Sequence, residues 1–252
     1  MDIYFKKGKI GILLIHGLNK SPEELRQLAL RLAAENFTVF CPTLPGHGSC
    51  PKDYGPHPTI NDSCPFQVMN STLKEWNQKV EESFNFLNKK VDKIYLAGVS
   101  LGGNLAFHLA GSKKINGLIS LGAPIFLSKG LDYGLKLASG GLRFFNTVKG
   151  KEKIMFHNVQ LSYVEELIGV LEQTKKDLPK VKCPVLIFHS LLDDISHPKS
   201  AKYVFRKIRS NNKKLVWLKN SVHGITFEKD QLEKIFQETV DFFSEIEKLN
   251  TY

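Results

Sequence analysis

Apolar and polar positions along the chain follow two periods, one typical of buried strands and one typical of helices. Short apolar runs bounded by polar or glycine residues recur, with helically spaced apolar positions between them. The predicted strands are Ile10–Ile15, Thr38–Cys41, Lys93–Ala97, Gly117–Leu121, Pro184–His189 and Leu215–Leu218. Strands that alternate with helices indicate an α/β fold, in which helices cover both faces of a mainly parallel sheet.

The predicted helices are marked by capping residues and by helical periodicity. The first is expected to begin at Ser21, with Pro22 in its first turn and Glu24 completing a reciprocal capping box. Two longer helices are expected over about residues 71–88 and 229–249. The apolar positions of the three helices each form one stripe: Leu25, Leu28, Ala29 and Leu32; Leu73, Trp76, Val80, Phe84 and Leu87; and Leu232, Ile235, Phe236, Val240 and Phe243.

Two stretches interrupt the alternation of strands and helices. Residues 46–65 form a long loop rich in Gly, Pro, Ser and Asn, and residues 123–182 form an insertion between two predicted strands. The insertion contains an amphipathic helix marked by Ser162 and Glu165 and by Val164, Leu167, Ile168 and Leu171. We therefore expect a core of residues 1–122 and 183–252 with a small helical cap of residues 123–182. A structural helical excursion is the alternative to a cap.

Length and composition fit one α/β domain. The 252 residues, 42% of them hydrophobic, provide a sizeable core. No apolar run reaches the roughly 20 residues of a membrane span, and residues 10–15 are too short for a secretory signal, so we expect a cytoplasmic protein. Cys41, Cys50, Cys64 and Cys183 show no metal-ligand spacing. We expect free thiols; a bond between Cys50 and Cys64 would require an oxidising setting.

The net charge of +10, from 35 basic and 25 acidic residues, raises the question of an anionic partner. Only five of the basic residues are arginine, the side chain preferred for phosphate and base contacts. The lysines are spread along the chain rather than gathered in one block. We expect an ordinary solvated surface and no nucleic-acid partner, while attraction to acidic lipids or anionic substrates stays open.

The segment Gly98-Val99-Ser100-Leu101-Gly102 lies between a predicted strand and a predicted helix. A serine at such a turn is held in a strained backbone geometry with its hydroxyl exposed, and a Cβ at either flanking glycine would collide with its neighbours. The pentapeptide alone is weak evidence for a nucleophilic serine, so the assignment depends on whether the rest of the chain supplies its catalytic partners. A serine hydroxyl needs a general base, usually a histidine that a carboxylate orients.

The triad of such sheets comes in the order serine, acid, histidine, and this order limits which histidine can be the base. Of eight histidines, only His197 and His223 follow both Ser100 and the strand at residues 184–189. His197 precedes Pro198 and is expected to start the next helix. His223 lies in a loop after the last predicted strand, and such loops at strand carboxyl ends form active sites. We predict that His223 is the base.

Two adjacent carboxylates are candidates for the acid. Asp193 and Asp194 both follow the strand at residues 184–189. We assign Asp193, which comes first, and expect Asp194 to cap the following helix or to stay solvated. A pair of aspartates in a loop is usually only surface, but the strand-end position and the order favour a site here.

The oxyanion of a tetrahedral intermediate needs preorganised N–H donors. The backbone N–H of Leu101, at a helix N-terminus, is one predicted donor, and that of Leu18 is the second. Gly17 lets the backbone turn tightly before Leu18, so Gly17, Leu18 and Leu101 are the predicted substrate contacts. His16 and His47 are expected to hold their loops rather than to carry protons.

Together these motifs resemble those of the α/β-hydrolases, and more closely those of small bacterial carboxylesterases and monoacylglycerol lipases. The segments that carry the resemblance are residues 13–18, 42–48, 98–103, 193–195 and 221–224. The resemblance implies hydrolysis of short- to medium-chain acyl esters or monoacylglycerols through an acyl-enzyme, without metal or organic cofactor. Acyl thioesterases, amidases and peptidases share these motifs and stay as alternatives, and a non-catalytic ligand-binding hydrolase fold is a remote one.

One departure from that family is the loop from Cys50 to Pro65, which is longer than usual and would narrow the mouth of the site. The basic and apolar character of the predicted cap leaves a weak contact with lipid surfaces open. The sequence predicts neither the acyl chain length nor the oligomeric state.

Overall fold

The computed structural model describes residues 1–47, 70–128, 161–219, 221–223 and 229–249. Most of the predicted long loop and of the predicted cap therefore lie outside the described residues, as do Cys50 and Cys64. The side chain of Ser162, the predicted cap of the insertion helix, is also outside them. Of the described cysteines, Cys41 and Cys183 are free thiols.

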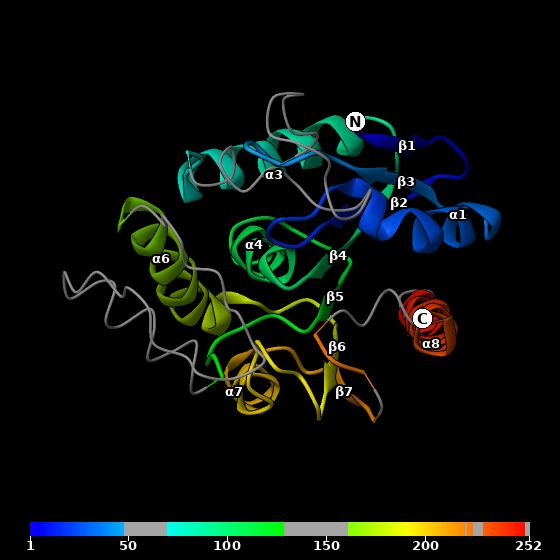
Figure 1. Ribbon diagram of the computed structural model, residues 1–252. Helices are drawn as coiled ribbons and strands as arrows, with labels where there is room; N and C mark the ends of the chain where they lie inside the picture. The colour runs from blue at the N-terminus through cyan, green and yellow to red at the C-terminus, as the bar shows by residue number, and fades with distance from the viewer. Residues whose placement is uncertain (48–69, 129–160, 220, 224–228, 250–252) are drawn as a thin grey trace.

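Seven strands of the described residues form one sheet, in the order β1-β3-β2-β4-β5-β6-β7 (Figure 1). The strands are β1 Ile3–Phe5, β2 Ile10–Ile15, β3 Thr38–Cys41, β4 Lys93–Val99, β5 Gly117–Leu121, β6 Val185–Ser190 and β7 Lys213–Leu218. Each pairs with its neighbours in parallel, except that β1 runs antiparallel to β3. The mainly parallel sheet is confirmed, and all six predicted strands are found within two residues at each end.

Strand β1 is the element that sequence reasoning missed. It has three residues, pairs only with β3, and buries Ile3 while Tyr4 stays exposed. Three residues are too few to show a period of two, so the pattern carries no signal for this edge strand.

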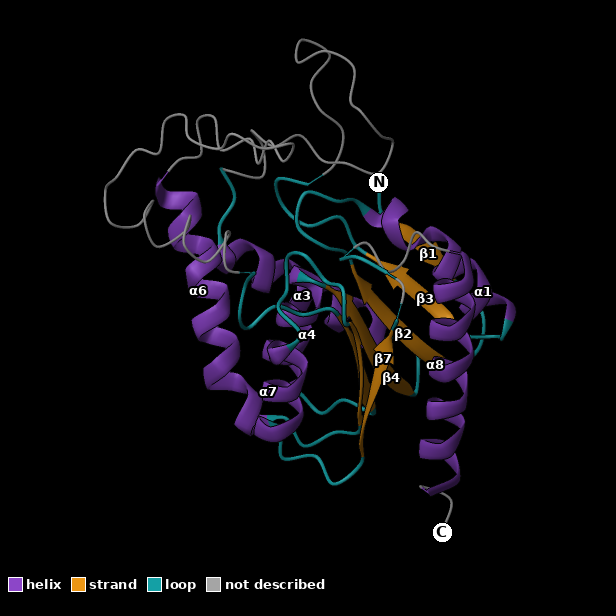
Figure 2. Cartoon of the chain, turned by 60° about the horizontal axis from the view of Figure 1, so that its bottom comes forward, coloured by secondary structure: helices purple, strands orange, loops and turns teal. Residues whose placement is uncertain are grey.

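Helices cover both faces of the sheet (Figure 2). The helices are α1 Arg26–Ala34, α3 Leu73–Asn88, α4 Leu101–Ala110, α6 Leu161–Asp177, α7 Lys199–Lys207 and α8 Lys229–Leu249. Side chains of β2 alternate between the two cores: Leu13 and Ile15 pack toward α3 and α4, whereas Ile12 and Leu14 pack toward α1 and α8. Burial on both faces explains why the central strands are continuous apolar runs.

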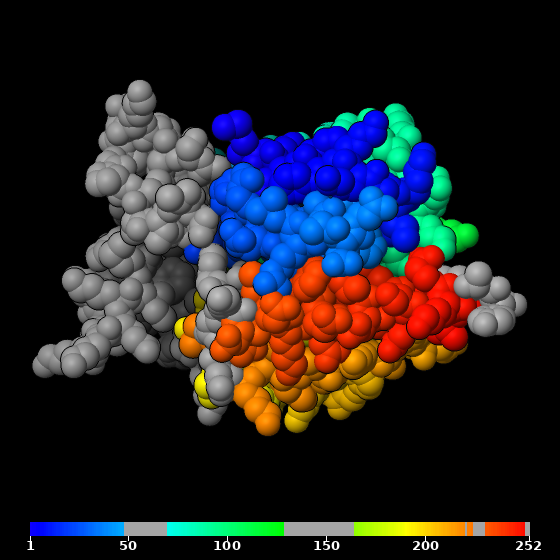
Figure 3. Space-filling model, turned by 90° about the vertical axis from the view of Figure 1, so that its right-hand side faces the viewer, coloured from blue at the N-terminus to red at the C-terminus, as the bar shows by residue number. Residues whose placement is uncertain are grey.

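Helices α1 and α8 lie side by side on one face of the sheet (Figure 3). Phe243 of α8 stacks on Tyr95 of β4, with ring centroids 4.0 Å apart. Arg31 of α1 and Glu233 of α8 form an ion pair at 2.6 Å at the surface, where such pairs contribute little. The C-terminal helix, predicted over residues 229–249, has those bounds in the structure.

The start of the first helix differs from the prediction. The chain first forms a 3₁₀ turn, η1 Pro22–Leu25, and α1 follows. The Ser21 hydroxyl caps it as expected, but it accepts from the N–H of Glu23 at 3.4 Å. The carboxylate of Glu24, predicted to complete a capping box, accepts from the backbone N–H of Gly17 at 2.7 Å. This contact reaches back to the loop after β2.

Helix α6, in the second described part of the predicted cap, is joined to the core. The Glu166 carboxylate accepts from the N–H of Leu73, the first residue of α3, at 2.7 Å. The Asn104 side chain on α4 donates to the Thr174 hydroxyl at 2.9 Å. Among the described helices, none is long and apolar enough to cross a membrane.

Candidate active site

Ser100 forms the sharp turn between β4 and α4. Its φ of 51° and ψ of −117° are strained for a residue with a side chain, and its N–H donates to the Leu121 carbonyl at 2.8 Å. The flanking glycines are required by close backbone approach. A Cβ on Gly98 would lie 2.2 Å from the Gly102 carbonyl oxygen, and one on Gly102 would lie 2.1 Å from that of Ile15.

The three residues predicted as a triad form a hydrogen-bonded chain with His223 in the middle. The Ser100 hydroxyl donates to His223 Nε2 at 2.8 Å, and His223 Nδ1–H donates to both carboxylate oxygens of Asp193 at 2.9 Å. An ionised carboxylate only accepts, so Nδ1 carries the ring proton and Nε2 is the acceptor. The residues come from loops at the carboxyl ends of β4, β6 and β7. This geometry allows His223 to take the serine proton.

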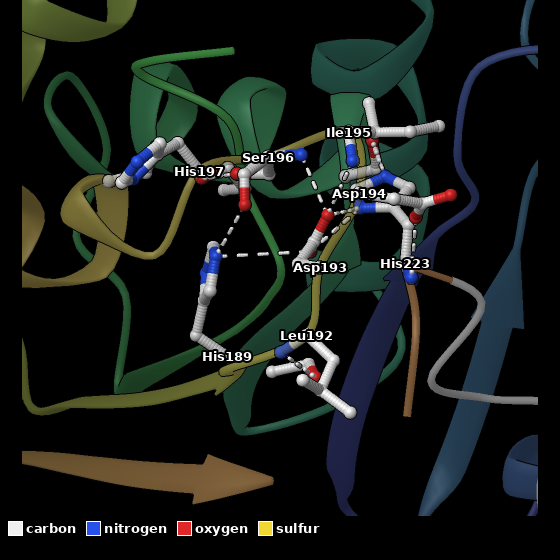
Figure 4. Close-up of polar contacts among 12 residues, drawn as sticks. His189, Leu192, Asp193, Asp194, Ile195, Ser196, His197 and His223 are labelled. Carbon is white, nitrogen blue, oxygen red and sulfur yellow. Dashed lines mark hydrogen bonds and ion pairs between the residues drawn. The ribbon is translucent and has the colours of Figure 1, made fainter. Parts of the chain in front are cut away.

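Asp193 is held by the backbone of its own loop. Its side chain is fully buried, and its Oδ1 accepts from the N–H groups of Ile195 at 3.0 Å and Ser196 at 2.7 Å (Figure 4). A buried carboxylate is costly unless hydrogen bonds stabilise its charge. These two N–H donors and His223 together supply that stabilisation and fix the orientation of the carboxylate.

Asp194 and His197 lie in the same loop with other contacts. Asp194 is exposed, and its carboxylate accepts from the backbone N–H of His223 at 3.3 Å. Of the two expectations for Asp194, the solvated position is confirmed and the helix cap is wrong, because Pro198 is the N-cap of α7. His197, predicted to start the next helix, lies two residues before the first residue of α7, Lys199, and its Nδ1 accepts from the N–H of Lys199 at 3.1 Å.

A second buried histidine, His189, contacts the loop that carries Asp193. Its Nε2–H donates to the Ser196 carbonyl at 2.9 Å and lies 3.8 Å from Asp193 Oδ2 (Figure 4). Burial lowers the pKa of His189, which keeps its ring neutral. In the sequence, His189 is the last residue of the predicted strand at residues 184–189 and lies just before the loop with the predicted acid. That position is the one sequence signal for its contact with the loop.

Two further histidines hold the loops on the other side of Ser100. His16 Nδ1–H donates to the Gly17 carbonyl at 2.9 Å, and its Nε2 accepts from the N–H of Leu44 at 3.1 Å. His47 Nδ1–H donates to the Pro45 carbonyl at 2.9 Å. Burial lowers the pKa of His16 to about 3 and that of His47 to about 4. Both rings are therefore neutral near pH 7 and hold loops, as predicted.

The predicted oxyanion residues flank Ser100. Leu101 is the first residue of α4 and is buried. Leu18 is partly buried against the core beside α4. Gly17 lies close to Ser100, since a Cβ built on Gly17 would be 3.6 Å from the Ser100 Cβ. Their role as donors to an oxyanion stays a prediction.

The site is a candidate for proton-assisted nucleophilic chemistry. It joins a strained serine, a histidine that can accept the serine proton, and a buried carboxylate. Within the described part of the chain, no group of three or more His, Cys, Asp or Glu side chains could hold a metal ion.

The chain matches known proteins over nearly its whole length. A family model described as alpha/beta hydrolase fold matches residues 12–150, and one described as serine aminopeptidase, S33, matches residues 146–230. A thermostable monoacylglycerol lipase of Bacillus sp. (strain H-257) is 28% identical over 251 residues, covering 96% of this chain and 93% of that protein. A carboxylesterase of Bacillus subtilis (strain 168) is 21% identical, with 96% of both chains covered. A solved structure from work on LipS and LipT, two metagenome-derived lipolytic enzymes, superposes on this chain with a TM-score of 0.79. The two chains are 25% identical, and the match covers 97% of each.

Proposed function

Since the chain belongs to the alpha/beta hydrolase fold family, we propose that it is an esterase of the carboxylesterase and monoacylglycerol lipase kind. It would hydrolyse short- to medium-chain acyl esters or monoacylglycerols through an acyl-enzyme on Ser100. The observation that carries this proposal is the continuous hydrogen-bonded chain from Ser100 through His223 to Asp193, with distances of 2.8 and 2.9 Å.

In the proposed reaction, His223 Nε2 takes the proton of Ser100 as the serine oxygen forms a bond to the acyl carbon. The ester C–O bond then breaks, and the alcohol leaves with the proton that His223 held. Water attacks the acyl-enzyme while giving a proton to His223, and the carboxylic acid leaves as Ser100 regains its proton. Asp193 stabilises the charged imidazole in both halves of the reaction.

Backbone N–H groups would hold the negative charge of each tetrahedral intermediate. Leu101 supplies one, since the first N–H groups of a helix have no intrahelical acceptor and the helix dipole favours negative charge there. Leu18 supplies the other from the loop after β2. Gly17, Leu18 and Leu101 would thus be the residues that contact the acyl carbonyl.

Residues 123–182 are proposed as the cap that selects the acyl group, on a core of residues 1–122 and 183–252. Support comes from α6, which packs on α4, the helix that begins beside Ser100. The Asn104 side chain donates both to Thr174 of α6 and to the Pro124 carbonyl at 2.8 Å. One side chain of the core thereby holds both described ends of the segment.

Amide hydrolysis is the second candidate, because the model described as serine aminopeptidase, S33, matches residues 146–230. The triad would be the same, with an amine instead of an alcohol as the leaving group. A panel of matched acyl esters, acyl thioesters and aminoacyl amides compares these donors directly. A higher kcat/KM on the amides would replace the esterase assignment.

The esterase proposal is tested with p-nitrophenyl acyl esters of increasing chain length. We expect turnover by the wild-type chain with a maximum at short to medium chains, and a loss of at least about 10⁴-fold in Ser100→Ala. A fluorophosphonate probe should label the wild-type chain but not this variant. Near-full activity or unchanged labelling in Ser100→Ala would show that Ser100 is not the nucleophile.

A further inference from the structure

Gly17 is held on both sides by hydrogen bonds. Its N–H donates to the carboxylate of Glu24 at 2.7 Å. Its carbonyl accepts from His16 Nδ1–H at 2.9 Å and from the N–H of Lys20 at 3.3 Å. Glycine has the freest backbone of all residues, so these contacts remove a freedom that the loop would otherwise have.

The contacts fix the direction of the Leu18 N–H as well. The carbonyl of Gly17 and the N–H of Leu18 belong to one peptide plane, and in a trans peptide they point in opposite directions. No peptide bond among the described residues is cis. A Gly17 carbonyl held by His16 therefore sets the Leu18 N–H on the opposite side, while Glu24 fixes the preceding peptide plane. Both planes on either side of Gly17 are then defined.

Glu24 is placed for this contact rather than for a surface role. It is 8% exposed, and a Cβ on Gly17 would be 3.3 Å from its Oε2 and 3.6 Å from the Ser100 Cβ. The neighbouring Glu23 is less buried and pairs with Arg26 instead.

We propose that Glu24 is a positioning residue of the oxyanion hole: its carboxylate fixes the peptide plane before Gly17 and, together with the contact of His16 to the Gly17 carbonyl, aims the Leu18 N–H at the acyl oxygen in the transition state. This inference rests on the proposed function. Without the contact, Gly17 samples other conformations and the donor is in place for a smaller fraction of the time. The ground-state carbonyl gains little from the donor, so kcat falls while KM changes little.

The test compares Glu24→Ala, Glu24→Gln and Glu24→Asp with the matched controls Glu23→Ala and Glu23→Gln. We expect Glu24→Ala to lower kcat about 10- to 100-fold, because one oxyanion donor is worth about 10²- to 10³-fold. KM should stay within about threefold. Glutamine keeps an acceptor oxygen at the same reach and should restore kcat to within about fivefold. Aspartate is one methylene too short and should not. Both Glu23 variants should stay within about twofold of wild type.

Thermal unfolding of each variant separates positioning from folding, and the Gln and Asp pair keeps the test informative if Glu24→Ala does not fold. The inference would be overturned if Glu24→Asp kept the wild-type kcat or if the variants raised KM and left kcat unchanged. It would also be overturned if Glu24→Gln lost as much kcat as Glu24→Asp. If the wild-type chain shows no acyl-ester turnover that Ser100→Ala abolishes, the proposed function itself is wrong. If it does, and the Glu24 variants behave like those of Glu23, only the positioning role is wrong.

Discussion

The loop after β2 and the turn after β6 each involve two adjacent carboxylates, and the two regions use them in opposite ways. In each pair one member is buried against the site, Glu24 or Asp193, and the other is less buried, Glu23 or Asp194. After β6, backbone N–H groups hold the buried carboxylate in place. After β2, the buried carboxylate holds a backbone N–H in place.

The difference follows from what each region contributes to the proposed reaction. Where a proton moves, a side chain must be fixed, and the surrounding peptides of residues 195 and 196 do this. Where charge develops on an oxygen, a peptide must be fixed, and side chains do this. The first arrangement is local, spanning two or three residues from Asp193. The second joins Gly17 to Glu24, seven residues away.

The largest effect is expected on the β6 side of this comparison. In Asp193→Asn, the amide can donate where the carboxylate accepted, so His223 loses the tautomer that accepts the serine proton. We expect kcat to fall about 10³- to 10⁴-fold, measured by steady-state ester hydrolysis with circular dichroism as a check of folding.

Asp194→Asn is the matched control for that experiment. Within the described part of the chain, its carboxylate accepts a hydrogen bond only from the N–H of His223, at 3.3 Å, and asparagine keeps an acceptor there. Activity should stay within about threefold of wild type. A greater loss in Asp194→Asn than in Asp193→Asn would exchange the two roles.

The sequence predicted the β6 side better than the β2 side for a physical reason. The order of Ser100, Asp193 and His223 and their places at strand ends are linear features, so the sheet alone brings them together. Glu24 follows Ser21 at the spacing of a capping box. The same spacing is found whether the Glu24 carboxylate accepts from the N–H of Ser21 or reaches back to the N–H of Gly17, so the sequence does not distinguish the two contacts.

His189 and β1 were missed for related reasons. His189 lies within an apolar strand, and its bond to the Ser196 carbonyl exists only after the loop returns across the strand end. Strand β1 depends on pairing with β3, which lies more than thirty residues along the chain. Contacts between residues that only folding brings together do not appear as a periodic pattern of apolar positions, so the sequence does not predict them.

The next effect in size concerns the stability of the β2 side in acid. The pKa of His16 is about 3 in the folded chain against about 6.5 when unfolded, because burial disfavours the charged ring. Below pH 6.5 the unfolded chain binds a proton that the folded chain does not, so stability is full above pH 6.5 and is lost as pH falls toward 3. The slope is about 1.4 kcal/mol per pH unit for each such histidine.

His16→Asn tests this, since its amide still reaches the Gly17 carbonyl but does not titrate. We expect the loss of unfolding free energy between pH 7 and pH 4.5 to be smaller than in wild type by about 2.5 kcal/mol, measured by urea unfolding. Equal pH dependence in wild type and His16→Asn would mean that the buried ring is not held neutral.

The smallest effect is expected from removing the Ser21 cap of η1, and it distinguishes the role of this cap from that of the Glu24–Gly17 contact. Ser21→Ala removes the hydroxyl that accepts from Glu23 at 3.4 Å, and such a cap is worth about 0.5–1 kcal/mol of stability. We expect urea unfolding to show that loss while kcat stays within about twofold of wild type, because Glu24, not the cap, fixes Gly17. Thr72→Ala, in the full capping box of α3, gives the reference loss for a cap far from the β2 loop. If Ser21→Ala instead lowered kcat as much as Glu24→Ala, the capped start of η1 would set the geometry of the loop after β2. The Glu24 carboxylate would then not be the group that fixes the Gly17 peptide, and the contrast with the turn after β6 would not hold.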